Sequence, residues 1–98
     1  MIPEMHVWVF NTSTGRFPGG IFQDLEQAKA WIAKNHLSGV LTAYPLNQGV
    51  FDWALENDAH NFSPSKIGAK AADPNFVGSF TTASMDHYHF EAGVLTSL

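Results

Sequence analysis

Residues 24–37 of the 98-residue chain read DLEQAKAWIAKNHL, and this stretch decides the predicted fold. The carboxylate of Asp24 can cap the first turn of a helix, and Gln27, three residues later, can complete a capping box. Apolar residues then recur at helical spacing along one stripe: Leu25, Ala28, Trp31 and Ile32. Gly39 follows shortly afterwards and suits a left-handed C-terminal cap. The pattern predicts an amphipathic helix over residues 25–37.

The sequence before this helix predicts a β-hairpin. Residues 5–10 (MHVWVF) are rich in β-branched and aromatic side chains, which predicts a strand that is apolar on both faces. Residues 11–15 (NTSTG) are turn-forming, and residues 16–22 continue in extended form. Since Pro18 cannot donate a ladder hydrogen bond, the second strand lies at a sheet edge or contains a bulge.

The sequence after the helix predicts three more strands, a second helix and a long loop. The strands are expected at residues 40–44, 76–80 and 85–91, the helix at 50–57, and the loop at 58–75, with a short frayed tail after Gly93. The order β-β-α-β-α-β-β predicts one α+β domain over residues 1–98, with a mainly antiparallel sheet of four or five strands and two helices on one face. The expected core includes Val7, Val9, Leu25, Ala28, Ile32, Leu41, Trp53 and Tyr88.

Composition and charge exclude several functional classes. The chain has no cysteine, so it has neither disulfides nor thiolate metal ligands, and a reducing compartment fits. The formal net charge is -4, and the five basic residues do not cluster, which argues against nucleic-acid binding. No signal-peptide pattern opens the sequence, and no apolar run approaches the ~20 residues of a membrane span. We therefore expect a soluble cytoplasmic protein whose partners include neither nucleic acid nor membrane.

Four motifs resemble those of one uncharacterised family of small bacterial domains. Residues 20–32 (GIFQDLEQAKAWI) are similar to the pattern G-V-F-x-(S/D)-x-E-x-A-x-x-(W/Y)-I. The other three motifs are residues 41–46 (LTAYPL), 49–54 (GVFDWA) and 87–90 (HYHF). The resemblance covers most of the chain, least in the 58–75 loop, and brings no established activity or catalytic residues with it. Relatives of this general kind occur as small partner-binding or immunity-type proteins, so the resemblance favours a binding role.

A histidine row on the last predicted strand is the candidate metal site. In residues 86–91 (DHYHFE), strand alternation places His87, His89 and Glu91 on one face and the aromatic residues on the other. Two imidazoles and a carboxylate can chelate a divalent metal, and His6 could add a ligand if its strand pairs with this one. The same residues also fit a solvated strand face or a partner interface. We expect no cofactor and no stoichiometric metal, because nothing in the sequence supplies the second shell that orients metal ligands.

The aromatic residues exceed what one helix-covered sheet face requires. The first strand is apolar on both faces, yet both predicted helices are expected on the same side. Either the 58–75 loop covers the second face, or aromatic surface stays exposed for another chain. The candidate partner-binding residues are Trp8, Phe10, His87 and His89. The partner is another protein or a second copy of this chain.

The sequence favours a non-enzymatic function. No serine lies in a nucleophile-elbow context, and residues 15–20 lack the Gly-Lys-Ser/Thr ending of a phosphate loop, so no catalytic residue is predicted. The leading hypothesis is a protein-binding module of a bacterial immunity or regulatory type. The alternative is a small metal-dependent enzyme or metal-binding protein that uses the His-x-His strand.

Overall fold

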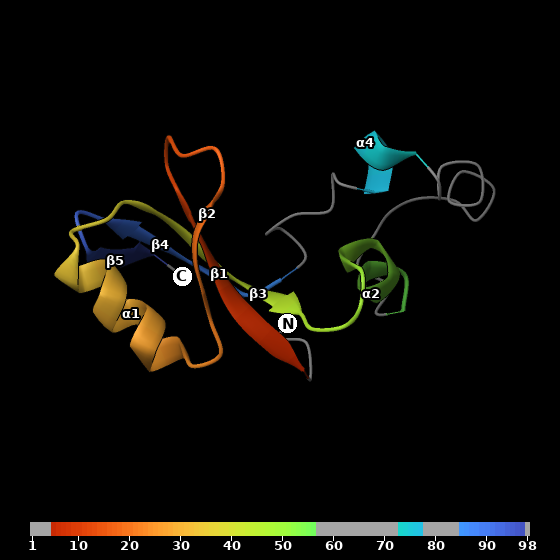
Figure 1. Cartoon of the computed structure of the whole chain (residues 1–98), viewed down its shortest axis with the longest axis horizontal. Coiled ribbons are helices and arrows are strands. Elements are labelled where there is room, and N and C mark those ends of the chain that lie inside the picture. The colour runs from red at the N-terminus through yellow and green to blue at the C-terminus, as the bar shows by residue number, and fades with distance from the viewer. Residues whose placement is uncertain (1–4, 57–72, 78–84, 98) are drawn as a thin grey trace.

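One five-stranded sheet organises the part of the chain that the structure describes (Figure 1). The structure, a computed structural model, describes residues 5–56, 73–77 and 85–97. Its elements are β1 (His6–Thr12), β2 (Pro18–Phe22), α1 (Leu25–Lys34), β3 (Gly39–Pro45), α2 (Val50–Glu56), α4 (Pro74–Val77), β4 (His87–Glu91) and β5 (Val94–Ser97). The strands are all antiparallel, in the order β2-β1-β3-β4-β5. The predicted α+β class, with an antiparallel sheet and two main helices, is confirmed.

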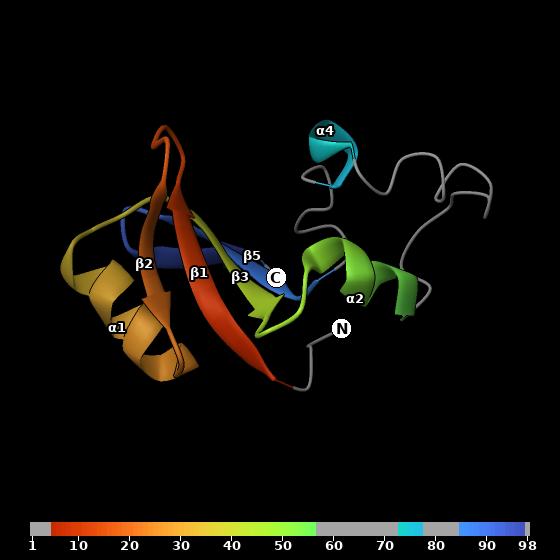
Figure 2. The ribbon, with the colours of Figure 1, turned by 45° about the vertical axis from the view of Figure 1, so that its right-hand side comes forward.

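Helix α1 lies against β1 and β2 on one face of the sheet (Figure 2). Its apolar stripe packs on alternate residues of the strands, and the buried cluster consists of Trp8, Phe10, Ala28, Ile32, Leu41, Ala43 and Phe90. Trp31 adds edge-on ring contacts with Phe10, at 6.0 Å between centroids, and a tilted contact with Phe22 at 5.4 Å. This aromatic layer fixes which face of every strand is inside.

Strand β1 corrects part of the predicted core. Trp8 and Phe10 point toward α1 and are buried, whereas Val7 and Val9 are only half-buried and point to the opposite face. Both alternate sets of this strand are apolar, so alternation alone does not choose between them. The aromatic side chains bury more apolar surface than valine, which favours the observed choice.

The other predicted core residues agree with the structure. Ala28, Ile32, Leu41 and Trp53 are buried, and Leu25 and Tyr88 are partly buried against the core.

Helix α1 begins as predicted and ends three residues early. The Asp24 side chain accepts a hydrogen bond from the backbone N–H of Glu26 at 3.4 Å. At the other end, His36 has a φ of 51°, and its N–H donates to the Ala33 carbonyl while that of Leu37 donates to Ile32. These two bonds form a Schellman motif, so His36 and not Gly39 provides the left-handed cap.

Gly39 has a different role, at the start of β3. A Cβ atom there would collide with the backbone oxygen of Asn11 on β1. The glycine therefore permits the close approach of β3 to β1.

The N-terminal hairpin has both features that Pro18 predicts, an edge position and a bulge. Strand β2 is an edge strand, and the β1–β2 register shifts by a bulge between Phe10 and Asn11, opposite the Pro18 end of β2. The edge position and the bulge both accommodate a residue that has no N–H.

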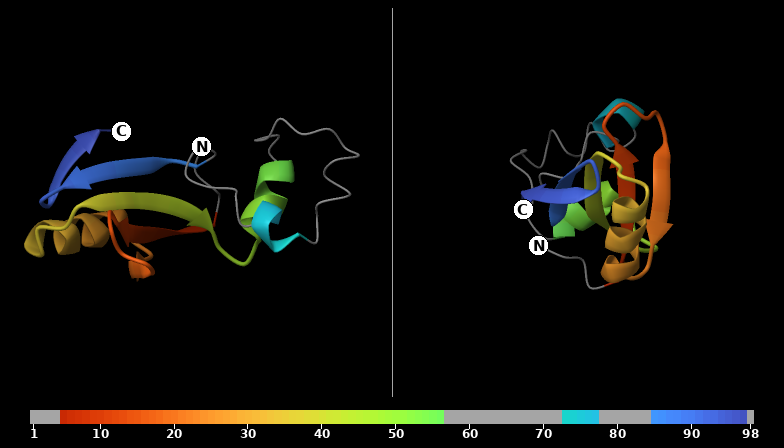
Figure 3. Two further views of the ribbon diagram at one scale, coloured as in Figure 1. Left: turned by 90° about the horizontal axis from the view of Figure 1, so that it is seen from above. Right: turned by 90° about the vertical axis from the view of Figure 1, so that its left-hand side faces the viewer.

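Helix α2 matches the predicted span but not the predicted position. It lies beyond the end of β3 rather than over the sheet face that α1 covers (Figures 1 and 3). There it forms a second apolar cluster of Trp53, Ala54 and Met85, against which Tyr44 and Val50 pack. Pro45 ends the strand and Asn47 has a φ of 61°, so the chain turns away from the sheet before the helix starts.

The last third of the chain differs from the prediction at two places. Residues 74–77 form the one-turn helix α4 instead of the start of a strand at 76–80, and residues 78–80 lie outside the described part of the chain. Residues 94–97, expected as a frayed tail, form strand β5, which pairs with β4. The predicted 58–75 loop lies outside the described residues except at its end, residues 73–75.

Candidate functional site

The face of the sheet away from α1 is the candidate site. We call it the open face, and its side chains are those of Val7, Val9, Asn11, Ile21, Val40, Thr42, Tyr44, His87, His89 and Glu91. The register places them in rows, because directly paired residues point to the same side of a sheet. One row runs Ile21, Val9, Thr42 and His87, and the next runs Asn11, Val40 and His89.

The apolar part of the open face is aliphatic. Ile21 on the edge strand β2 is 65% exposed. Val7, Val9 and Val40 are half-buried, and so is Tyr44, which also packs against the α2 cluster. Apolar area thus reaches from the β2 edge across to β3.

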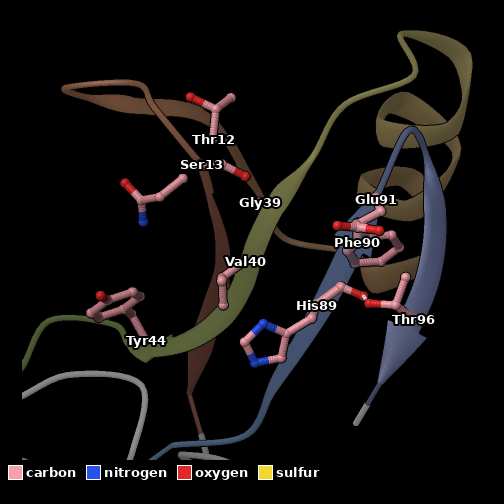
Figure 4. Close-up of a pocket in the computed structure, with 10 residues that line it drawn as sticks. Thr12, Ser13, Gly39, Val40, Tyr44, His89, Phe90, Glu91 and Thr96 are labelled. Carbon is pink, nitrogen blue, oxygen red and sulfur yellow. Dashed lines mark hydrogen bonds between the residues drawn. The ribbon is translucent and has the colours of Figure 1, made fainter.

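A shallow groove of about 670 Å³ crosses one part of the open face (Figure 4). It is lined by Asn11, Thr12, Ser13, Gly39, Val40, Tyr44, His89, Phe90, Glu91 and Thr96. In Figure 4, Val40 lies between Tyr44 and His89, while Glu91 and Thr96 lie together on the β4–β5 side. The groove therefore combines an apolar centre with an amide, four hydroxyls, an imidazole and a carboxylate.

The histidine row lies on the open face, as alternation predicts. The rings of His87 and His89 are 5.2 Å apart between centroids and nearly perpendicular. His87 is partly buried, and its Nδ1 lies 2.9 Å from the carbonyl oxygen of Met85. His89 is exposed at the groove, and Glu91 follows two residues later on the same side.

The predicted metal set does not assemble as a whole. His6 pairs with Pro45 and has its ring 5.6 Å from Trp8, which places it on the α1 face. His6 therefore lies on the opposite face of the sheet from His87 and His89, because it occupies the other parity of β1. Within residues 5–56, 73–77 and 85–97, no group of three or more potential ligands is close enough to hold a metal ion.

The apolar surface of the open face consists of other residues than the predicted aromatic ones. Trp8 and Phe10 are 3% and 0% exposed beneath α1, on the face opposite the two histidines. The prediction missed Ile21, Val40 and Tyr44, which supply the exposed or half-buried apolar surface of the open face. If Trp8 is known to face the core, the alternation along each strand and the strand register place Ile21, Val40 and Tyr44 on the opposite face.

Thr42 at the centre of the open face is a further residue that the prediction missed. Its side chain is fully buried, and its hydroxyl oxygen has no hydrogen-bond partner among the described residues. It lies between Val9 on β1 and His87 on β4.

Comparison with known protein families identifies the domain. A family model described as a domain of unknown function, DUF7710, matches residues 7–96. The chain belongs to this family. The match reaches from β1 to β5 of the DUF7710 domain, so the open face and its groove lie within the family's span. No curated protein and no solved structure matches the chain. In the described part of the DUF7710 domain, no helix has the length and apolar character to cross a membrane.

Proposed function

We propose that this DUF7710 domain is a non-enzymatic protein-binding module whose partner docks on the open face. The observation that supports this most is the arrangement of the described elements: α1 covers one face of the sheet, α2 lies beyond the end of β3, and the other face carries Ile21 at 65% exposure beside half-buried valines. Apolar surface of this kind, bordered by polar side chains, is typical of a contact with another protein.

The groove supports binding more than catalysis. The imidazole rings of His87 and His89 form no hydrogen bond to a hydroxyl or carboxylate among the described residues, so neither ring is paired with a nucleophile or an orienting acid. A nucleophilic mechanism requires such a pair within hydrogen-bond reach.

We also propose that the domain is of bacterial origin, works in the cytoplasm, and serves as an immunity-type or regulatory protein. The cysteine-free sequence fits a reducing compartment, and a net charge of -4 with five scattered basic residues fits a protein partner better than a nucleic acid. The partner is another protein or a second copy of the chain.

A metal-binding protein or small metal-dependent enzyme is the second candidate. The adjacent rings of His87 and His89 favour it, because two imidazoles on one strand face can act as two ligands. Glu91 is on the same side, but among the described residues it does not complete a group of three ligands close enough to hold a metal ion.

Affinity capture with paired variants tests the proposal. The purified domain is immobilised, incubated with the cytoplasm of its host, and the retained proteins are quantified by mass spectrometry. We expect Ile21→Lys and Val40→Lys to lose a retained protein that wild type keeps, because a lysine in an apolar contact carries an uncompensated charge. The control is Ala30→Lys, an exposed position on α1, on the opposite face.

Thermal unfolding of each variant first establishes that it is folded. A retained set that is identical for the wild type and both open-face variants would overturn the proposal.

A further inference from the structure

The groove on the open face has an uneven charge. Glu91 is its single carboxylate, and none of the ten residues that line it is a lysine or arginine. Lys29 and Lys34 are on α1, which covers the other face, and Arg16 is in the β1–β2 turn. The groove therefore presents hydrogen-bond acceptors and one negative charge to whatever enters it.

Glu91 has no counter-charge within the domain as described. Its side chain is exposed and forms no ion pair with the described residues. By contrast, Glu26 on α1 lies 3.8 Å from the ammonium of Lys29, one turn away. Glu91 thus has a carboxylate available to a partner.

We propose that the groove receives an arginine or lysine side chain from an extended segment of the partner protein, with Glu91 as its counter-charge. The inference rests on the proposed function, since it names the chemistry of the partner at the same face. The charged head would bind the Glu91 carboxylate, and Asn11 and the hydroxyls of Ser13 and Thr96 offer further acceptors.

The apolar centre of the groove fits the stem of the same side chain. Long basic side chains lay their methylene groups on apolar surface while the head stays at polar groups. Val40 at the centre and the ring of Tyr44 beside it provide that surface. An acidic segment would meet repulsion from Glu91, and the net charge of -4 further attracts a basic partner.

The first experiment is a selection with a stated probe. A phage-displayed library of random peptides of about 12 residues is selected on the immobilised domain at pH 8, and the enriched peptides are tested again on Glu91→Gln. We expect peptides that bind the wild type and are lost on Glu91→Gln to contain arginine or lysine at about three times the library frequency or more, because the variant removes only the charge. The matched control is Glu26→Gln, the same change on the opposite face.

The second experiment measures one selected peptide by calorimetry. We expect Glu91→Gln to weaken binding about five-fold, which is roughly 1 kcal/mol, and Glu26→Gln to leave it unchanged. Raising NaCl from about 50 mM to about 500 mM should weaken wild-type binding and have much less effect on Glu91→Gln.

Several results would overturn the inference. They are enriched peptides that are neutral or acidic, peptides whose binding survives Glu91→Gln, and a selection that enriches nothing. Neutral peptides whose binding is lost on Ile21→Lys or Val40→Lys but kept on Glu91→Gln would contradict the binding of a basic side chain. They would still support the open face as a docking surface. Peptides that ignore all three changes would contradict both proposals together.

Discussion

The buried hydroxyl of Thr42 on β3 lowers the stability of the fold. The side chain is fully buried in the middle of the sheet, yet its hydroxyl has no hydrogen-bond partner in the described part of the chain. A buried hydroxyl without a partner costs about 1–3 kcal/mol, because water bonded to it in the unfolded chain. Thr42→Val keeps the shape and removes that cost, so we expect the variant to be more stable by about 1 kcal/mol in denaturant titration. A loss of stability of similar size would mean that the hydroxyl is hydrogen-bonded in solution.

The histidine pair leads to a prediction about metal content. His87 and His89 can provide two ligands, but His6 is on the other face and no third ligand completes a cluster among the described residues. Purified without a histidine tag, the protein is expected to contain no stoichiometric metal by elemental analysis. About one zinc or similar ion per chain, lost when His87→Ala and His89→Ala are combined, would reverse this conclusion and support the second candidate function.

The sequence determined the sheet face of some side chains but not of others. Alternation correctly put His87 and His89 on one face, because their strand has polar residues at one parity and aromatic residues at the other. The same rule failed for Trp8 and Phe10, since valines occupy the other parity of β1 and both sets are apolar. Only the packing of α1 decides between two apolar parities.

Helix α1 provides the sharpest stability comparison, because an isoleucine is present on each side of the sheet. Ile32 is fully buried beneath the strands, whereas Ile21 on the open face is 65% exposed. We expect Ile32→Ala to cost about 3 kcal/mol, as a core truncation that leaves a cavity does. Ile21→Ala should cost less than about 1 kcal/mol, because most of that side chain is already in water. Equal losses in denaturant titration would contradict the assignment of the two faces.

Two elements, β5 and α4, were not predicted from the sequence. Strand β5 follows a two-residue turn in which Ala92 and Gly93 have φ angles of 49° and 86°. Such a turn is usually signalled by asparagine or glycine at its first position, and an alanine there gives no signal. Tertiary bonds hold the turn, since the N–H of Gly93 donates to Leu37 and that of Ala92 to the Ser38 hydroxyl.

Helix α4 was missed because its apolar residues also suit a strand. The Asp73 side chain accepts from the backbone N–H of Asn75 at 3.0 Å, and Pro74 occupies the first helical position. Aspartate followed by proline is a recognised helix start, which was outweighed by the apolar pair after it.

At the scale of the whole molecule, self-association is the form of partner binding that the pure protein can show. If a second copy docks through the histidine row, His89→Lys places like charges together at the contact and shifts the equilibrium toward monomer. Light scattering at high protein concentration measures this shift. A wild-type monomer at high concentration leaves the open face to a foreign partner. A dimer that His89→Lys leaves unchanged excludes the histidine row from the contact.

The arrangement of the sheet explains how much of the site the sequence could predict. The surplus of apolar residues over one helix-covered face follows from composition and element count, and among the described residues α1 covers only one face of the sheet. The groove could not be predicted from the sequence. It is lined by Asn11 on β1, Val40 on β3 and Thr96 on β5, and only the strand order brings these residues together.

The most direct test of the open face as a docking surface is site-specific photo-crosslinking in the host cell. A photoreactive amino acid replaces Ile21 or Val40 on the open face, and Ala30 or Glu26 on the exposed side of α1 as controls. A benzophenone side chain reacts only with groups in direct contact, so the adduct reports which face a partner covers. We predict one dominant adduct from positions 21 and 40, either a foreign protein or a second copy of the chain, and none from positions 26 and 30. Adducts absent from the open face, or equally abundant from both faces, would contradict the account.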